Sequence, residues 1–146
     1  MAKAEIHTDY GVMTVDFFEK DAPNTVANFI KLAKDGYYDG LIFHRVIPNF
    51  VVQTGDPTGT GAGGPGYAID CELTGDNQYH DRGALSMAHR GPNTGGSQFF
   101  ICHNRDNTQH LDRKHTVFGK VTGNVDIVDQ IKQGDKMLKV VVTEEA

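Results

Sequence analysis

An arginine and a glutamine interrupt an otherwise apolar hairpin pattern near the middle of the sequence. The segment reads FHRVIPNFVVQTGD, residues 43–56, with Arg45 before and Gln53 after a Pro-Asn-Phe stretch at residues 48–50. If residues 48–50 are a three-residue loop, Arg45 lies opposite Gln53 on paired strands. The amide can then orient the guanidinium by hydrogen bonding, and the apolar neighbours form pocket walls. An arginine that merely rims a sheet and covers it with its stem is the alternative.

Side chains alternate along a strand, and this assigns two faces to the first half of the hairpin. One face is expected to carry Phe43, Arg45 and Ile47. The other face is expected to carry His44 and Val46. The arginine is therefore predicted to share its face with two apolar side chains, as a binding pocket requires.

Two further segments combine polar and apolar side chains in a way that suits a groove for an extended ligand. In MAHRGPNTGGSQFFIC, Gln98 and Phe100 fall on one side of a strand pattern whose other side is apolar. The turn-rich residues before that strand leave backbone groups free to pair with a ligand. In QHLDRKHTVFGKV, Leu111 and His115 stand beside another strand.

The glycine-rich stretch GTGAGG, residues 59–64, fits the pattern G-x-G-x-x-G. Dinucleotide-binding loops of this pattern follow a strand and open a helix. Here Pro65 and Gly66 follow, and no helix start is visible. The stretch is interpreted as a surface loop beside the groove, and no cofactor is expected.

Two other constellations fit catalytic chemistry less well. His103, His110 and His115 lie in one segment, but their spacings of seven and five residues match no short helical pair of metal ligands. Ser86 and Ser97 lie outside the G-x-S-x-G pattern of serine hydrolases. We interpret His110 as a surface residue and His115 as a pocket wall, and we expect no metal site.

The remaining elements predict a mostly β chain with two helices. AEIHTDYGVMTVDFF, residues 4–18, reads as a hairpin. Apolar residues at i, i+3, i+4 and i+7 from Val26 predict an amphipathic helix between Pro23 and Gly36. Further strands are expected within residues 83–88, 97–102, 115–121 and 136–145, and a second helix within residues 124–135. A closed barrel would leave no exposed sheet edge, and the helices would cover its openings.

Length, charge and cysteine content limit the classes of function. The 146 residues suit one domain, spanning 1–146, and a net charge of −5 argues against a nucleic-acid binder. No stretch approaches the ~18 apolar residues of a membrane span or the apolar run of a signal peptide. A cytoplasmic protein without membrane contact is therefore expected, and we also expect a monomer. Cys71 and Cys102 are expected to be reduced thiols, although export would allow a bridge between them.

Three long segments resemble a known family. FHRVIPNFVVQTGD, SMAHRGPNTGGSQFFI and HLDRKHTVFGKV are similar, in order and spacing, to the signature segments of the cyclophilins, the cyclosporin-binding class of peptidyl-prolyl cis–trans isomerases. The first hairpin, the APNTVANF helix and the closing strand also match, so the resemblance covers essentially the whole chain and fits the compact single-domain microbial members. It implies a closed eight-stranded antiparallel β-barrel capped by two α-helices, with the site on its outer surface. It also implies action on proline-containing peptides and on unfolded or folding proteins.

The resemblance assigns roles by position. Arg45 takes the place of the catalytic arginine, and Gln53 supports it and meets the substrate backbone. Residues expected to line the proline pocket are Phe50, Phe100, Leu111 and His115, with Val51 at its border. Of these, Phe50 and His115 count with Arg45 and Gln53 as catalytic. Ala88 and His89 are expected to offer backbone contacts to the residues before the proline, with Gln98 and His110 on the same groove.

Three positions depart from the best-known family pattern. Val51 stands where many members have Met, His110 where many have Trp, and His89 where Asn is common. Loss of the indole removes a large surface and a hydrogen-bond donor. We therefore predict weak cyclosporin binding, while peptide isomerisation persists. A module that binds proline-containing segments without useful turnover is the rival interpretation, since the same residues can serve recognition alone.

Overall fold

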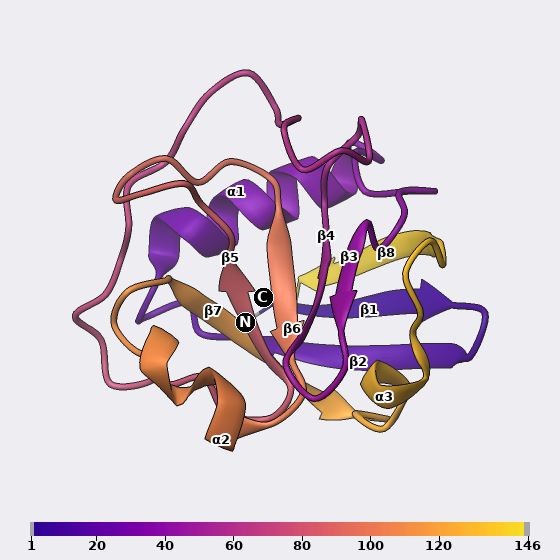
Figure 1. The fold of residues 1–146 in the computed structure, drawn as a ribbon. Coiled ribbons are helices and arrows are strands. Elements are labelled where there is room, and N and C mark those ends of the chain that lie inside the picture. Colours follow the sequence, from indigo (N-terminus) through magenta and orange to yellow (C-terminus); the bar gives the residue numbers. More distant parts are fainter. Residues whose placement is uncertain (1, 145–146) are drawn as a thin grey trace.

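A computed structural model describes residues 2–144 of the chain (Figure 1). The strands are β1 (Ala2–Thr8), β2 (Gly11–Phe17), β3 (Arg45–Ile47), β4 (Val51–Thr54), β5 (Ala84–Met87), β6 (Phe99–Cys102), β7 (Val117–Gly123) and β8 (Met137–Glu144). The helices are α1 (Pro23–Lys34), α2 (Arg105–Thr108) and α3 (Ile127–Gln130), with a 3₁₀ turn at Gln109–Leu111.

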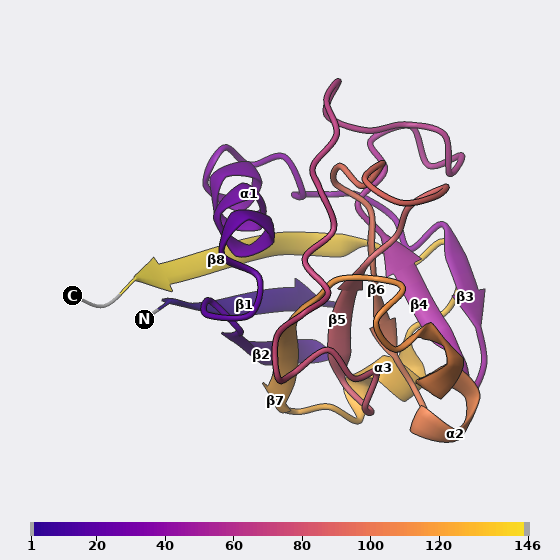
Figure 2. The same cartoon turned by 90° about the vertical axis from the view of Figure 1, so that its left-hand side faces the viewer.

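The eight strands form one antiparallel sheet in the order β3-β4-β6-β5-β7-β2-β1-β8. The sheet curls strongly, so that β3 and β4 stand across from β1, β2 and β8 when the molecule is seen from the side (Figure 2). Buried and exposed residues alternate along β1, as expected for a strand with one face on a core. The curl therefore gives the sheet an inner face that is filled and an outer face that is free to carry a site.

The sheet does not close into a barrel. Its end strands, β3 and β8, share no ladder within residues 2–144, and the segments that precede them meet through one bridge between Ile42 and Lys136. A hydrogen bond from the Met137 N–H to the Leu41 carbonyl, 2.7 Å long, supports that bridge. The expected closed barrel is therefore wrong, and the fold is an open, curled half-barrel. The reason is that β3 has only three residues and pairs with β4 alone.

Helix α1 forms where the apolar spacing predicts it. Pro23 occupies the first turn, where its missing N–H removes no helical hydrogen bond. Gly36 follows the last turn with φ of +75°, a conformation that glycine adopts without strain. The helix packs against β7 and β8 and lies over one open end of the half-barrel (Figures 1 and 2). No helix within residues 2–144 is long and apolar enough to cross a membrane.

The second expected helix is much shorter than predicted. Helix α3 is a single turn, and Ile131 already has an extended backbone with ψ of 132°. Residues 132–135 are held by tertiary contacts instead, since the Phe43 N–H donates to the Asp135 carbonyl at 2.8 Å. A helix continuing through residues 132–135 would lose that bond, so the long-range contact overrides the local spacing.

Two apolar clusters lie on the two faces of the sheet. In the inner cluster, Phe29 of α1 contacts four other aromatic rings at centroid distances of 4.9–5.5 Å, those of Phe17, Tyr38, Phe99 and Phe118. The outer cluster consists of Val51, Ala84, Phe100, Cys102 and Val117. Strand β6 separates the two as predicted, with Phe99 and Ile101 inside and Phe100 and Cys102 outside. The outer cluster is the base of the candidate site.

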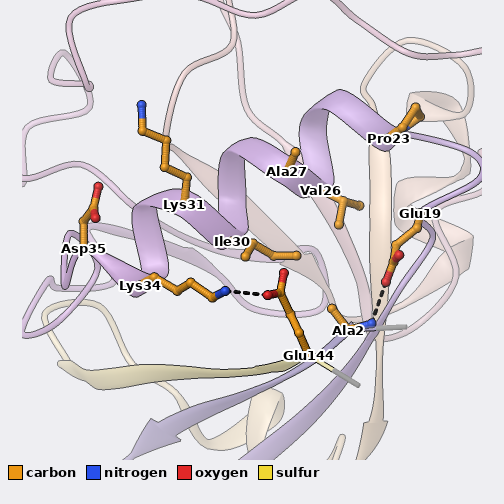
Figure 3. Close-up of a pocket in the computed structure, with 10 residues that line it drawn as sticks. All are labelled: Ala2, Glu19, Pro23, Val26, Ala27, Ile30, Lys31, Lys34, Asp35 and Glu144. Carbon is orange, nitrogen blue, oxygen red and sulfur yellow. Dashed lines mark hydrogen bonds and ion pairs between the residues drawn. The ribbon is translucent and has the colours of Figure 1, made fainter. Parts of the chain in front are cut away.

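A roomy hollow of about 700 Å³ lies on another part of the molecule, between α1 and the ends of β1 and β8 (Figure 3). Ile30 and Val26 form its apolar wall, and an ion pair between Lys34 and Glu144, 2.5 Å long, spans one side. None of the residues predicted to form the site lines this hollow. On another side the Ala2 N–H donates to Glu19 at 2.6 Å, and the predicted site residues lie in a different part of the molecule.

Candidate active site

The hairpin of β3 and β4 has the predicted register. Arg45 pairs with Gln53 across the three-residue loop at 48–50. Asn49 takes the left-handed backbone conformation, with φ of 64°, which the short polar side chain of asparagine tolerates. The Phe50 N–H donates to the Ile47 carbonyl at 3.0 Å and closes the turn. This local turn chemistry fixes which residue faces Arg45.

The predicted place of Phe43 is wrong. Strand β3 begins only at Arg45, and Phe43 lies before it, fully buried in the inner cluster. The backbone of Phe43 is bonded to the turn before β8, so the strand alternation does not extend back to this residue. The face of Arg45 is completed instead by Val51, which belongs to the outer cluster.

A chain of hydrogen bonds holds the Arg45 guanidinium. Arg45 Nη1 donates to Gln53 Oε1 at 3.3 Å, and Gln53 Nε2 donates to Gln98 Oε1 at 3.0 Å. Gln98 Nε2 donates in turn to the carbonyls of Gly61 and Gly63, at 3.0 and 2.9 Å. Each amide has one orientation that satisfies both of its neighbours, and in that orientation Arg45 meets an acceptor.

A hollow of about 180 Å³ opens beside Arg45 on the outer face of the sheet. Its lining consists of Arg45, Phe50, Val51, Gln53, Ala88, His89, Phe100, Leu111 and His115. The other two predicted site residues adjoin it. Gln98 does so through its bond to Gln53, and His110 stacks on Phe50 with ring centroids 5.9 Å apart. The structure therefore brings all of the predicted site residues to one place.

The ring of His115 is a neutral wall of this hollow. Burial lowers the pKa of His115, and its Nδ1–H donates to the Met87 carbonyl at 2.9 Å. The ring meets Phe100 edge-on at a centroid distance of 5.6 Å and stacks on His89 at 4.0 Å. A neutral imidazole presents an aromatic surface to the hollow, and Arg45 is the only arginine or lysine among the nine lining residues.

A second hollow of about 450 Å³ adjoins the first and shares Gln53, Ala88 and His89 with it. The Ala88 N–H is already engaged, since it donates to the Gln98 carbonyl at 3.0 Å. A peptide backbone lying in this hollow must therefore use the carbonyl of Ala88, as an acceptor. Of the backbone groups of Ala88, we therefore expect only the carbonyl oxygen to contact the substrate.

The glycine-rich stretch forms a loop without a helix, as predicted, and it wraps a carboxylate of its own chain. Asp56 is 1% exposed and accepts from the N–H groups of Thr58, Thr60 and Gly61 at 2.8, 3.0 and 2.6 Å. Burial alone would raise the pKa of Asp56, but the hydrogen bonds, those from Thr58 foremost, lower it to about 2. These donors are occupied by a side chain of the protein, and not by a phosphate group.

A hydrogen-bonded trio that no sequence pattern predicts lies behind the hollow. His80 is fully buried, and its ring stacks on Phe100 with centroids 5.9 Å apart. His80 Nδ1–H donates to Asp112 Oδ1 at 3.2 Å, and the Ser86 hydroxyl donates to His80 Nε2 at 2.7 Å. The order of groups is that of a serine hydrolase, but Ser86 is fully buried, so a substrate carbonyl cannot reach it. The trio supports Phe100 from behind. No pattern marks His80 in the sequence, because it lies in an irregular segment before β5.

The trio makes stability depend on pH in a predictable direction. Burial lowers the pKa of His80 from 6.5 to about 4. Between these values the unfolded chain binds the proton and the folded chain does not, so acid favours unfolding. As the pH falls from about 7 to about 4, protonation of His80 in the unfolded chain should lower the free energy of unfolding by about 3 kcal/mol. Urea unfolding across this range should show a shallower pH dependence for His80→Gln, and an unchanged slope would contradict the assignment.

The three histidines of the segment 103–115 do not lie together. His103 lies beside α3, where its Nε2–H donates to the Val128 carbonyl at 3.0 Å, whereas His110 and His115 lie at the hollow. Within residues 2–144, no three His, Cys, Asp or Glu side chains come together as metal ligands. Both cysteines are free thiols, and burial raises the pKa of Cys102 to about 12.

Known proteins resemble this chain over nearly its full length. A family model described as cyclophilin type peptidyl-prolyl cis-trans isomerase/CLD matches residues 3–145. A peptidyl-prolyl cis-trans isomerase of Synechococcus elongatus is 53% identical over 148 residues, which cover 100% of this chain and 99% of the relative. Peptidyl-prolyl cis-trans isomerase B of Bacillus subtilis is 56% identical over 125 residues, 86% of each chain. A cyclophilin type isomerase of Cryptosporidium parvum, crystallised in the presence of the dipeptide Ala-Pro, matches with a TM-score of 0.88 at 32% identity, covering 98% of this chain and 99% of its own.

The chain therefore belongs to the family of cyclophilin type peptidyl-prolyl cis–trans isomerases. Its enzyme class is that of the isomerases, as the resemblance of the three long segments implies. The curled antiparallel sheet with its helices is the fold of the solved cyclophilins that it matches.

Proposed function

We propose that this chain accelerates rotation about X-Pro peptide bonds in the hollow beside Arg45, with the guanidinium as the catalytic donor. The observation that carries the proposal is the hydrogen bond from Arg45 to Gln53 at the rim of an apolar hollow. It supports a permanently charged donor, held in one orientation, where a proline ring can sit. Arginine keeps its charge at any relevant pH, and its N–H groups form a rigid fork.

The chemistry of the X-Pro bond explains why such a donor suffices. Amide resonance sets a rotational barrier of about 18–20 kcal/mol, and no covalent bond has to break. As the bond twists, the prolyl nitrogen becomes pyramidal and regains a lone pair that can accept a hydrogen bond. A donor aimed at this nitrogen therefore stabilises the twisted state more than either planar state. One hydrogen bond to a charged group contributes about 1.5–3 kcal/mol, or about 10- to 150-fold in rate.

The walls of the hollow are proposed to supply further acceleration. Phe50, Phe100 and Leu111 can grip the pyrrolidine ring while the chain before the proline rotates. The adjoining hollow along Ala88 has room for the residues before the proline, and Gln53 can meet their backbone. Apolar walls also exclude water that would compete for the amide groups. We propose proline-containing peptides and folding proteins as substrates, with residues 1–146 acting as a single, monomeric domain.

Exchange spectroscopy by NMR on one proline-containing peptide tests the proposal against the rival binding module. Adding catalytic amounts of the protein should produce cis–trans exchange cross-peaks within a mixing time at which the free peptide shows none, because uncatalysed exchange takes tens of seconds or more. The same titration gives the affinity. A protein that binds the peptide but leaves its exchange rate unchanged would be a binding module, and the proposal would be wrong.

Cyclosporin binding is expected to be weak, because His110 lacks the surface and the donor of an indole. Isothermal titration calorimetry on the wild-type protein measures the affinity, and His110→Trp should tighten it. His110 stacks on Phe50 at the edge of the hollow, so the larger ring has a surface to lie on. Nanomolar affinity of the wild-type protein would contradict the prediction.

A further inference from the structure

We propose that Asp56 is a positioning residue for Arg45, acting through the glycine-rich loop, Gln98 and Gln53; this inference rests on the proposed catalytic role of Arg45. Asp56 does not line the hollow. It is, however, the fixed point of a continuous set of hydrogen bonds that ends on the guanidinium. In this proposal the glycine-rich stretch binds no phosphate. It connects Asp56 to Gln98 and so helps to orient Arg45.

The first step of the relay is the grip of Asp56 on the loop. Asp56 Oδ1 accepts from the backbone N–H and the hydroxyl of Thr58, each at 2.8 Å. Asp56 Oδ2 accepts from the N–H groups of Thr60 and Gly61, at 3.0 and 2.6 Å. Both oxygens accept from backbone N–H groups, so an amide in this place would turn its NH₂ group toward at least one backbone donor whichever way it lies.

The second step is the close seating of the loop on this carboxylate. A Cβ atom at Gly63 would lie 2.0 Å from Asp56 Oδ1 and 2.9 Å from the Thr58 side chain, so only glycine fits. The loop therefore passes directly over Asp56. This path directs the carbonyls of Gly61 and Gly63 together toward Gln98 Nε2.

In the third step, the orientation of the Gln98 amide sets the orientation of the Gln53 amide. Two loop carbonyls demand that Gln98 turn its NH₂ group toward them, which leaves Gln98 Oε1 facing Gln53. Gln53 must then donate through Nε2, which leaves its Oε1 as the acceptor for Arg45. If the loop carbonyls were released, Gln98 would lose both of its acceptors, and only Arg45 would remain to orient the two amides. Asp56 thus fixes the far end of the hydrogen-bonded chain that holds Arg45.

Two substitutions test the relay at different atoms. Asp56→Asn removes an acceptor, and Gly63→Ala leaves the carboxylate intact but displaces the loop that it holds. Each should lower the isomerisation rate of bound peptide about tenfold, as a small misplacement of a catalytic group does. Asp9→Asn, which removes a charge from an exposed turn, and Gly91→Ala, whose methyl group meets open space, should leave that rate unchanged. NMR line-shape analysis on one proline-containing peptide gives the rate and the dissociation constant separately, and thermal unfolding shows that each variant is folded.

A double-mutant cycle with Gln98→Ala distinguishes positioning from a general structural role. Gln98→Ala cuts the relay, so adding Asp56→Asn should change the rate no further. Equal slowing by Asp56→Asn in the wild-type and Gln98→Ala backgrounds would overturn the inference. So would wild-type rates for both Asp56→Asn and Gly63→Ala in an enzyme that Arg45→Ala slows. A fully active Arg45→Ala variant would instead overturn the proposed function itself, so the two failures can be told apart.

Discussion

Arg45→Ala is expected to lower the isomerisation rate about 10- to 150-fold, because it removes the only donor proposed to act on the prolyl nitrogen. The fold should survive, since Arg45 is exposed and lies on a short strand at the end of the sheet. A protease-coupled assay on a proline-containing peptide measures the loss, and circular dichroism reports the fold. The residual activity reports the share of the rate that the apolar walls supply.

Matched variants sharpen the test of Arg45. Lys139→Ala removes an exposed cation from β8, away from the hollow, and should isomerise the peptide at the wild-type rate. Arg45→Lys keeps the charge but loses the rigid fork that Gln53 holds, so it should recover little of the activity. A folded Arg45→Ala variant with full activity would refute the catalytic assignment. Full activity in Arg45→Lys would show that charge alone suffices and that the fixed orientation does not matter.

Phe29→Ala is expected to have the largest effect on stability, a loss of about 3–5 kcal/mol in the free energy of unfolding. Phe29 is 1% exposed and contacts the rings of four residues, which come from β2, β6, β7 and the turn after α1. Its removal leaves a cavity between α1 and the inner face of the sheet, which the rigid half-barrel can fill only in part. Urea unfolding measures the loss.

Ile30→Ala is the matched control for Phe29→Ala. Ile30 is the next residue of the same helix, but it is only partly buried and borders the open hollow beside β8 (Figure 3). Its truncation should lower the free energy of unfolding much less. Because Phe29 lies on the inner face and the site on the outer face, folded Phe29→Ala should keep its isomerase activity. Equal losses of stability in the two variants would contradict the placement of the core.

The hairpin of Arg45 could be predicted from the sequence because its causes are local. A three-residue loop, a residue that tolerates positive φ and the alternation of side chains fix the pairing of Arg45 with Gln53 without help from the rest of the chain. The same holds for α1, where spacing, Pro23 and Gly36 act within one segment. The rest of the site was assigned through the family resemblance, which supplied the long-range juxtaposition that local patterns cannot.

The features that sequence analysis missed depend on contacts between distant segments. Helix α3 stops early because the residues after it bond to Phe43, more than eighty positions away. The one-turn helix α2 begins at a cap in which Asn104 Oδ1 accepts from the Asp106 N–H, a signal too short to stand out from a turn. The partner of Asp112 behind the pocket is His80, which no periodicity marks. The openness of the sheet depends on β3, which has three residues and is shorter than the alternation from Phe43 predicted.

A crystal structure of the protein with a bound Xaa-Pro peptide tests the central claim most directly. The account predicts that the pyrrolidine ring lies against Phe100 in the hollow beside Arg45. It also predicts that an N–H of Arg45 points at the prolyl nitrogen, at about 3 Å or slightly beyond. A proline ring bound elsewhere, or a guanidinium directed away from the prolyl nitrogen while Gln53 still holds it, would contradict the account.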